Sequence, residues 1–580
     1  MSSPLEKMIV RRSPARGGQD LSGGMHPLLR RVYAHRGVAS TAALNLGLSE
    51  LHSLSWLGGA RAAAALLHRV MASQGRILVL ADFDADGATS CALMIRGLRM
   101  MGAENLDYLV PDRFRFGYGL TKEILEVALE YRPDLLVTVD NGISSLEGVA
   151  AARAAGIQVL ITDHHLPGQM LPDADVIVNP NQPGDPFPSK HLAGVGVVFY
   201  VLAALRDRLR TQGWFDDRKL AEPNLASLLD LVALGTVADV VPLDRNNRIL
   251  VHQGLKRIRA GRCCKGIDAL VRVSGRRRSI LTASDLGFAL GPRLNAAGRL
   301  ETMSLGIECL LTDDAVTAEN LAWQLDSLNR ERRAIEDEMR QQATVDMEGL
   351  LPEGGLPFGI CLFRPEWHPG VVGILAARIR EYYHRPVIAF AGGETPGLLK
   401  GSARSVPGLH IRDTLDSLAA RHPKLLRNFG GHAMAAGVSL DRNDFERFTV
   451  AFDQEVRRCL GEDSLRCVIH SDGELAPEDL QLEVAELLRE GGPWGQGFPE
   501  PQFDGRFRVV EHRVVGDRHL KLTLIPAGGG EPVDAIAFGQ AEHRPESGQE
   551  LLRLVYRLEV NEFRGRRRLQ LLIEHFEVLG

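Results

Sequence analysis

Between residues 76 and 180 the chain alternates short apolar runs with stretches of helical periodicity. The apolar runs are RILVLADF, DYLVPD, LLVTVDNG, QVLITDHH and DVIVNP. Strands that are apolar along nearly their whole length are typical of a parallel sheet covered by helices on both faces. We therefore expect a doubly wound α/β domain, in which a ligand would bind outside the carboxyl ends of the strands.

The rest of the chain predicts further domains, because 580 residues exceed the usual size of one hydrophobic core. A helical spacing of apolar residues predicts a long connecting helix. A second alternation of strand-like and helical runs follows it, and then several short alternating strands typical of an OB-type barrel. The expected parts are an N-terminal helical segment over 1–60, an α/β domain over 61–312, the connecting helix over 313–352, a second α/β domain over 353–465 and the barrel over 466–580.

Charge and cysteine usage narrow the setting. The formal net charge of −5 taken alone disfavours a nucleic-acid partner, since phosphate binding draws on Lys and Arg. Arginine is nevertheless dense at 276–278 and 564–568, so positive patches are available. Seven cysteines without a CxxC pair indicate a reducing, cytoplasmic protein. No apolar run reaches the roughly eighteen residues of a membrane span, and we expect no membrane association.

The most informative motif is ADFDADG, in which Asp82, Asp84 and Asp86 alternate between an apolar strand and a helix start. Alternate side chains point the same way, and three carboxylates on one side repel one another unless cations neutralise them. A loop of solvated acids is the alternative. An EF-hand is excluded, because the acid at the last loop position is missing and the flanks are strand-like.

Further acids and histidines follow other apolar runs. Asp140 lies in VTVDNG, His164 and His165 follow Asp163 in ITDHH, and Asp239 lies in GTVADVV. Adjacent histidines at a strand end are uncommon as core filler. We expect the motifs to converge at one edge of the sheet.

Carboxylate oxygens with imidazole nitrogens suit Mn²⁺ or Mg²⁺, whereas the absence of Cys from these motifs disfavours structural zinc. Two such ions about 3.5–4 Å apart activate water and stabilise the leaving oxygen at phosphorus. The sequence therefore predicts a phosphoester hydrolase with two divalent cations.

These motifs resemble a known family. The DHH phosphoesterase superfamily is matched by DFDADG (82–87), VDNG (139–142), TDHH (162–165) and GTVADVVPL (235–243). Its bacterial exonucleases are matched by GPRLNAAGR (291–299), WHPGVVGILAARI (367–379), LKGSARS (399–405) and FGGHAMAAG (429–437). The likeness covers nearly the whole chain and assigns a DHH catalytic domain to 61–312 and a DHHA1 domain to 353–465.

The resemblance implies an exonuclease that digests single-stranded DNA from 5′ to 3′ and releases 5′-mononucleotides in recombination and repair. It places His165 beside the scissile phosphate and makes Asp140 and His164 catalytic. Which of the three alternating acids contacts which ion stays open, because related pyrophosphatases use a histidine where this chain has Leu80. The implied metal ligands are Asp82, Asp84, Asp86, Asp140, His164 and Asp239.

An exonuclease also has to hold a strand end, and Arg forks with small hydroxyl donors suit a terminal phosphate. The alternative for these arginines is surface or interdomain salt bridges. A Gly is expected where this chain has Ala403, and its methyl group would lie near the phosphate pocket. The resemblance also implies that the DHHA1 domain faces the metal site across a narrow cleft. The implied substrate-binding residues are Arg113, Arg293, Arg299, Ser402, Arg404 and His432.

The barrel would add stacking faces for the strand at Phe538, Tyr556 and Phe563, although such aromatics are usually core. The expected partners are single-stranded DNA and, by resemblance, single-strand-binding protein and a helicase, with the protein itself a monomer. One alternative is a hydrolase of short oligonucleotides or cyclic dinucleotides, and the barrel speaks against it. The other is an inactive scaffold that only binds DNA, and the intact acids speak against it.

Overall fold

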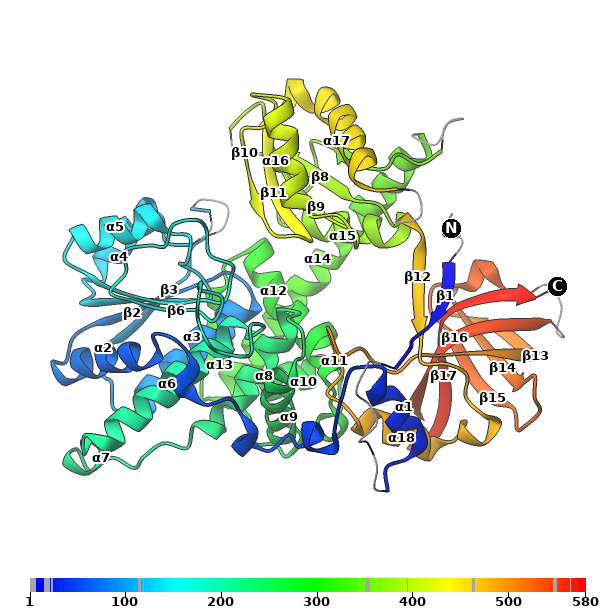
Figure 1. Ribbon diagram of the computed structural model, residues 1–580, viewed down its shortest axis with the longest axis horizontal. Coiled ribbons are helices and arrows are strands. Elements are labelled where there is room, and N and C mark those ends of the chain that lie inside the picture. The colour runs from blue at the N-terminus through cyan, green and yellow to red at the C-terminus, as the bar shows by residue number, and fades with distance from the viewer. Residues whose placement is uncertain are drawn as a thin grey trace. The chain divides into compact units, whose positions relative to one another are not determined.

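The structure is a computed structural model in which the chain forms two compact units (Figure 1). The N-terminal unit comprises Ser13–Asn329 and Glu486–Pro501, and the C-terminal unit comprises Met1–Arg12, Arg330–Ala485 and Gln502–Gly580. The structure describes residues 7–14, 21, 24–112, 116–117, 119–349, 355–393, 395–461, 465–545, 550–563 and 565–579.

The N-terminal unit is built on a parallel sheet with the strand order β3-β2-β4-β5-β6. Figure 1 shows helices on both of its faces, which confirms the predicted doubly wound fold. The strands are β2 (Ile77–Ala81), β3 (Leu106–Leu109), β4 (Leu135–Val139), β5 (Gln158–Thr162) and β6 (Val176–Val178).

One face of this sheet packs on α4 (Lys122–Glu130) and α5 (Leu146–Ala154). Leu80 and Ile161 of the sheet lie in one buried cluster with Ile124 of α4. Because side chains alternate along a strand, the neighbouring residues of β2 and β5 face the opposite layer. That layer holds α2 (Ala60–Ala72), α3 (Ala85–Met100) and α6 (Gly194–Thr211).

A helical region completes the N-terminal unit, as the sequence predicts. It includes a π-helical turn at Leu286–Leu290 directly before α12. The helices are α7 (Trp214–Asp217), α8 (Leu229–Ala238), α9 (Arg245–Arg259), α10 (Lys265–Val273), α11 (Ala283–Asp285), α12 (Gly291–Leu300) and α13 (Ser304–Leu311). The predicted connecting helix is α14 (Ala315–Gly349), whose Ala318, Ala322 and Leu325 are fully buried.

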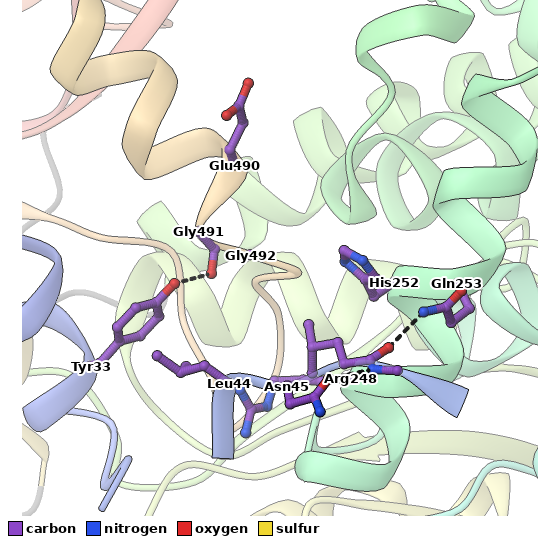
Figure 2. Close-up of a pocket in the computed structure, with 11 residues that line it drawn as sticks. Tyr33, Leu44, Asn45, Arg248, His252, Gln253, Glu490, Gly491 and Gly492 are labelled. Carbon is purple, nitrogen blue, oxygen red and sulfur yellow. Dashed lines mark hydrogen bonds between the residues drawn. The ribbon is translucent and has the colours of Figure 1, made fainter. Parts of the chain in front are cut away.

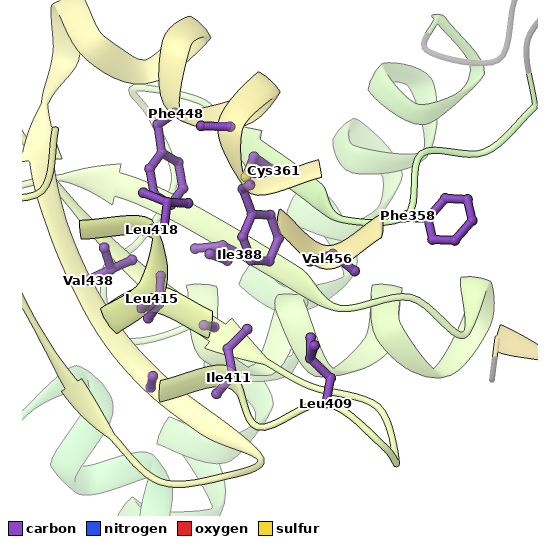
Figure 3. Close-up of a cluster of buried hydrophobic side chains, with 14 of the residues drawn as sticks. Phe358, Cys361, Ile388, Leu409, Ile411, Leu415, Leu418, Val438, Phe448 and Val456 are labelled. Carbon is purple, nitrogen blue, oxygen red and sulfur yellow. The ribbon is translucent and has the colours of Figure 1, made fainter. Parts of the chain in front are cut away.

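The C-terminal unit contains a five-stranded mixed sheet with the order β10-β11-β9-β8-β7. Only β7 and β8 pair in parallel. Figure 3 shows its core, in which Leu415, Leu418 and Phe448 of the helices pack near Ile388 and Val438 of the sheet. The elements are β7 (Ile360–Phe363), α15 (Val372–Tyr383), β8 (Val387–Gly392), β9 (Leu398–Arg404), α16 (Ile411–Arg421), β10 (Asn428–Gly431), β11 (Ala435–Asp441) and α17 (Phe445–Cys459).

A closed five-stranded barrel ends the chain, with the order β13-β14-β15-β17-β16. All neighbours are antiparallel except β15 and β17, which run in parallel. The strands are β13 (Phe503–Val515), β14 (His519–Pro526), β15 (Val533–Ala537), β16 (Leu551–Phe563) and β17 (Arg566–Leu579). A short helix, α18 (Leu482–Glu490), precedes the barrel.

The beginning of the chain differs from the expected helical segment. Residues 7–11 form β1 (Lys7–Arg11), which pairs in parallel with β12 (Cys467–Ser471). The cause is the long-range partner strand, which no local pattern reveals. Helical structure follows as α1 (Pro27–Ala34) and 3₁₀ turns at Thr41–Leu44, Leu48–Glu50 and Leu54–Trp56. Within the described residues, no helix is both long and apolar enough to cross a membrane.

Candidate metal centre

The first acidic loop joins β2 to α3 and is held by backbone amides. Asp84 caps α3, with its Oδ1 accepting hydrogen bonds from the nitrogens of Asp86 at 2.9 Å and Gly87 at 3.0 Å. The buried Asp86 accepts from the nitrogens of Gly194 at 2.6 Å and Val195 at 3.0 Å. The first turn of α6 therefore fixes the Asp86 carboxylate, an arrangement that the sequence motif alone does not reveal.

Asp140 follows β4 in a left-handed backbone conformation, with φ of 64°. Such a φ is uncommon for a residue other than Gly, and strained residues of this kind cluster at functional sites. A Cβ at Gly194 would lie 2.6 Å from Asp140 Oδ1, so only glycine permits this approach. The pKa of Asp140 is raised well above its usual value by burial and then by the nearby charges of Asp86 and Asp84.

His164 brings the acids of three segments together. Its Nε2 lies 3.1 Å from Asp140 Oδ1, 3.5 Å from Asp239 Oδ2 and 4.0 Å from Asp86 Oδ2. Asp239 immediately follows α8, and the next residue, Val240, again has a positive φ of 63°. Burial and the charge of Asp86 raise the pKa of Asp239. Burial and the charge of Asp84 raise that of Asp86 to about 7.

His165 is oriented by Asp163 rather than by the other acids. Its Nδ1 lies 2.7 Å from Asp163 Oδ1, and Asp163 Oδ2 accepts from the Ile143 nitrogen at 2.9 Å. Burial lowers the pKa of His165, but the hydrogen bond and charge of Asp163 outweigh it and raise the pKa to about 9. Burial would raise the pKa of Asp163, yet the bond to His165 lowers it. No role was predicted for Asp163 from the sequence, although its position directly before two histidines was a usable signal.

The described residues thus offer three overlapping groups of ligand atoms, each lying within 4.8 Å of one another. These are Asp82, Asp84 and Asp140; Asp86, His164 and Asp239; and Asp140, His164 and His165. Oxygen donors with one or two imidazoles fit Mn²⁺ or Mg²⁺. The predicted convergence is confirmed, and the burial of Asp82, Asp86 and Asp140 contradicts a loop of solvated acids. The ligand role of each residue stays a prediction.

The motif 291–299 forms α12 and supports the acidic loop. Asn295 Oδ1 accepts from the Ala85 nitrogen at 2.8 Å, and a Cβ at Gly298 would lie 1.9 Å from the Phe83 carbonyl oxygen. Arg299, in the last turn of α12, is half-buried. Arg113 lies outside the described residues. The motif therefore has a structural function that its arginines did not suggest.

Arg293, which was expected in a phosphate fork, lies beside a buried carboxylate. The side chain is buried, and its Nε and Nη2 donate to Asp326 Oδ1 at 2.9 and 2.8 Å. Its Nη1 donates to the Ala289 carbonyl oxygen at 2.6 Å. A guanidinium engaged by a buried carboxylate is a structural ion pair. We therefore interpret Arg293 as joining α12 to α14, which is the salt-bridge alternative.

The other predicted substrate-binding residues lie in the C-terminal unit. Arg404 Nη1 donates to Ser402 Oγ at 3.2 Å on β9, and a Cβ at Gly373 of α15 would lie 2.8 Å from that Oγ. Ala403 between them is fully buried in the hydrophobic core of the same sheet, so its methyl group points away from the Ser402 and Arg404 face. His432 is exposed in the turn between β10 and β11.

This chain is similar to known proteins along nearly its whole length. Three family domains match: the DHH family N-terminal domain over residues 76–236, the DHHA1 domain over 357–458 and the RecJ OB domain over 471–575. The single-stranded-DNA-specific exonuclease RecJ of Dickeya dadantii is 54% identical over 98% of this chain and 98% of its own length. The chain belongs to the RecJ family. Membership agrees with the fold and with the resemblance drawn from the motifs.

Solved RecJ structures share this fold. RecJ of Thermus thermophilus in complex with Mn²⁺ matches with a TM-score of 0.81 and 30% identity, over all of this chain and 80% of that one. Its complex with Mg²⁺ matches with a TM-score of 0.75 and 29% identity, over 99% of this chain and 79% of that one. The Thermus thermophilus protein is thus solved with each of the two cations that the donor set of this chain favours.

Proposed function

We propose that this chain is a metal-dependent exonuclease that digests single-stranded DNA from 5′ to 3′ and releases 5′-mononucleotides, in recombination and DNA repair. The observation that carries the proposal is the convergence of Asp86, Asp140 and Asp239 on His164 Nε2. The relatives of this chain are named single-stranded-DNA-specific exonuclease RecJ, which agrees with such a centre.

Two cations, Mn²⁺ or Mg²⁺, are proposed for this centre. Asp82, Asp84 and Asp140 would hold one ion, and Asp86, His164 and Asp239 would hold the other. Asp140 also shares a ligand group with His164, which places it beside both proposed positions. Bound ions of this kind activate water and neutralise charge on a phosphate. The raised pKa values of Asp86, Asp140 and Asp239 support the assignment, because burial and then mutual repulsion disfavour the charged carboxylates until a cation neutralises them.

His165 is proposed to act on the scissile phosphate. With a pKa of about 9 the His165 ring carries a proton at neutral pH. Its Nδ1–H then donates a hydrogen bond to Asp163 Oδ1. A protonated imidazole at this position would donate to a phosphate oxygen or to the leaving oxygen. Asp163 fixes the ring orientation and is a positioning residue.

Recognition of the strand end is proposed for Arg299, Ser402, Arg404 and His432, and for Arg113 by resemblance. The direct contact between Ser402 and Arg404 supports a shared anion site, because a hydroxyl beside a guanidinium suits a terminal phosphate. In the barrel, Phe538 is 55% exposed and offers a stacking face, whereas Tyr556 is 1% exposed and belongs to the core. The Phe563 side chain lies outside the described residues.

The biological setting is proposed from the same likeness. The substrate is single-stranded DNA, the partners are single-strand-binding protein and a helicase, and the enzyme acts as a monomer in the cytoplasm. The seven free cysteines support a reducing compartment.

The test uses purified full-length protein with single and double strands labelled at the 5′ or the 3′ end, in Mn²⁺ or Mg²⁺. We expect single strands alone to be degraded, with a labelled mononucleotide as the first product of the 5′-labelled strand. Release of the 3′ label first would contradict the polarity. Cleavage restricted to oligonucleotides of a few residues would favour the short-substrate alternative, and no cleavage would favour the inactive scaffold.

A further inference from the structure

A cavity lies in the N-terminal unit, and none of its lining residues belongs to the metal centre. Its volume is about 320 Å³, which is within the range of small-molecule pockets. Figure 2 shows its walls, which come from the N-terminal segment, from α9 and from the segment after α18. The lining residues are Tyr33, Leu44–Gly47, Arg248, His252, Gln253 and Glu490–Gly492.

Arg248 is the notable side chain in this wall, because it is a buried cation without a counter-ion. The residue is 6% exposed, and among the described residues its Nε has no hydrogen-bond partner. Its guanidinium lies over the Phe498 ring, 4.2 Å from the centroid. The Asp244 carboxylate interacts electrostatically with Arg248, but it accepts a hydrogen bond from Ser189 Oγ at 2.6 Å.

Such a guanidinium is costly to bury without an acceptor. A cation–π contact satisfies none of its N–H donors, and an unpaired buried charge destabilises a fold. Arg245, three residues earlier on α9, is paired with Glu50 at 2.6 Å. The two arginines lie on the same helix but differ in their surroundings. Arg245 has a carboxylate partner, whereas Arg248 faces the cavity and has none within the described part of the chain.

Two other polar groups of the cavity are arranged as acceptors. The Tyr33 hydroxyl donates to the Gly491 carbonyl oxygen at 2.8 Å, so its oxygen lone pairs are left to accept. Gln253 Nε2 donates to the Leu46 carbonyl oxygen at 2.6 Å, which leaves Oε1 as an acceptor. In Figure 2 the Glu490 carboxylate is directed away from Arg248.

We propose that this cavity binds a small phosphate-bearing ligand, with Arg248 holding the phosphate and Tyr33 and Gln253 accepting hydrogen bonds from hydroxyl or amino groups. A planar guanidinium suits phosphate oxygens through paired N–H donors. The acceptors match a nucleoside monophosphate, whereas free phosphate would use Arg248 alone. The site is separate from the metal centre and does not depend on the proposed nuclease activity.

The test is isothermal titration calorimetry of the full-length protein in EDTA, which removes cations from the metal centre. The probes are thymidine 5′-monophosphate, inorganic phosphate and uncharged thymidine. We expect saturable binding of the monophosphate at one site, at least tenfold tighter than binding of thymidine. Tighter binding of the monophosphate than of phosphate identifies a nucleotide, and equal binding identifies a site for the phosphate group alone.

Three variants make the assignment specific. Arg248→Gln should weaken binding of the monophosphate at least tenfold. Because a buried substitution can prevent folding, Asn45→Asp at the exposed rim tests the same site by adding a negative charge, and it too should weaken binding. Arg245→Gln, with the same charge change on the same helix, should leave affinity unchanged. The proposal fails if neither phosphate nor the monophosphate binds saturably, or if a folded Arg248→Gln and Asn45→Asp bind as the unmodified chain does.

Discussion

Arg11 and Asp504, which are 493 residues apart in the chain, form a two-pronged ion pair within the C-terminal unit. Arg11 Nε lies 3.0 Å from Asp504 Oδ1 and Nη2 lies 2.7 Å from Oδ2. Ser471 Oγ donates to the same carboxylate at 2.5 Å. The pair thus joins β1 and β12 to the first strand of the barrel.

The first prediction concerns this pair. Burial alone would raise the pKa of Asp504, but the hydrogen bonds from Arg11 and Ser471 lower it. An acid with a depressed pKa stabilises the fold above its unfolded pKa of about 3.9 and loses that contribution as the pH falls. Asp504→Asn should lower the free energy of unfolding by about 1–2 kcal/mol at pH 7, measured by urea denaturation.

The loss should shrink as the pH falls below about 4, where the unmodified chain loses the same charge. Asp517→Asn, at an exposed turn of the same barrel, is the matched control and should leave stability unchanged. A loss for Asp504→Asn that is independent of pH would show that the charge of Asp504 is not what stabilises the fold.

The second prediction concerns catalysis. Asp140→Ala and His165→Ala should each reduce digestion of labelled single strands by at least about 10²–10³-fold, because each removes a group proposed to act at the reacting phosphate. Circular dichroism should show a folded protein in both cases. Asp107→Ala, at an exposed position of β3 in the same sheet, should retain activity. Undiminished digestion by either centre variant would overturn the site assignment.

The third prediction concerns cation binding and stability. Mn²⁺ at about 100 times its Kd should stabilise the fold by about 2.7 kcal/mol for each site, because binding to the folded state alone shifts the unfolding equilibrium. The increase in melting temperature over an EDTA sample should therefore be large for the unmodified chain and much smaller for Asp239→Asn. Asp107→Asn serves as the control. An equal increase in all three proteins would place Mn²⁺ elsewhere.

The fourth prediction separates the two arginines of α12. Arg293→Ala should lower the free energy of unfolding by about 3–5 kcal/mol, since it leaves the buried Asp326 carboxylate without this partner. Arg299→Ala should leave stability nearly unchanged and raise KM for strands that carry a 5′-phosphate. Denaturant unfolding and steady-state kinetics of both variants decide between these roles. If Arg293→Ala were as stable as the unmodified chain, the structural interpretation would be wrong.

These two arginines also show what a sequence can reveal here. The apolar periodicity of the strands predicted a parallel sheet, and with it the edge at which Asp86, Asp140 and His164 meet. That inference works because the carboxyl ends of parallel strands share one edge. Arg293 and Arg299 have the same chemistry within one motif, and only the distant Asp326 distinguishes the structural one.

Other features were out of reach for the same reason. The left-handed Asp140 depends on the absence of a side chain at Gly194, and β1 depends on a partner strand far along the chain. Ala403 could not be assigned to the core until the register of β9 was known. Local pattern predicts elements and their ends, whereas these details are set by contacts between distant residues.

The parallel pairing of β1 with β12 has a consequence for biosynthesis. The amino-terminal strand leaves the ribosome first, and the strand that completes its ladder is made only after more than four hundred further residues. Until then the backbone amides and carbonyls of β1 lack their ladder partner. An affinity tag fused before β1 would therefore be attached to the C-terminal unit, which assembles last. Newly made chains should therefore acquire protease resistance in the N-terminal unit before residues 7–11 become protected.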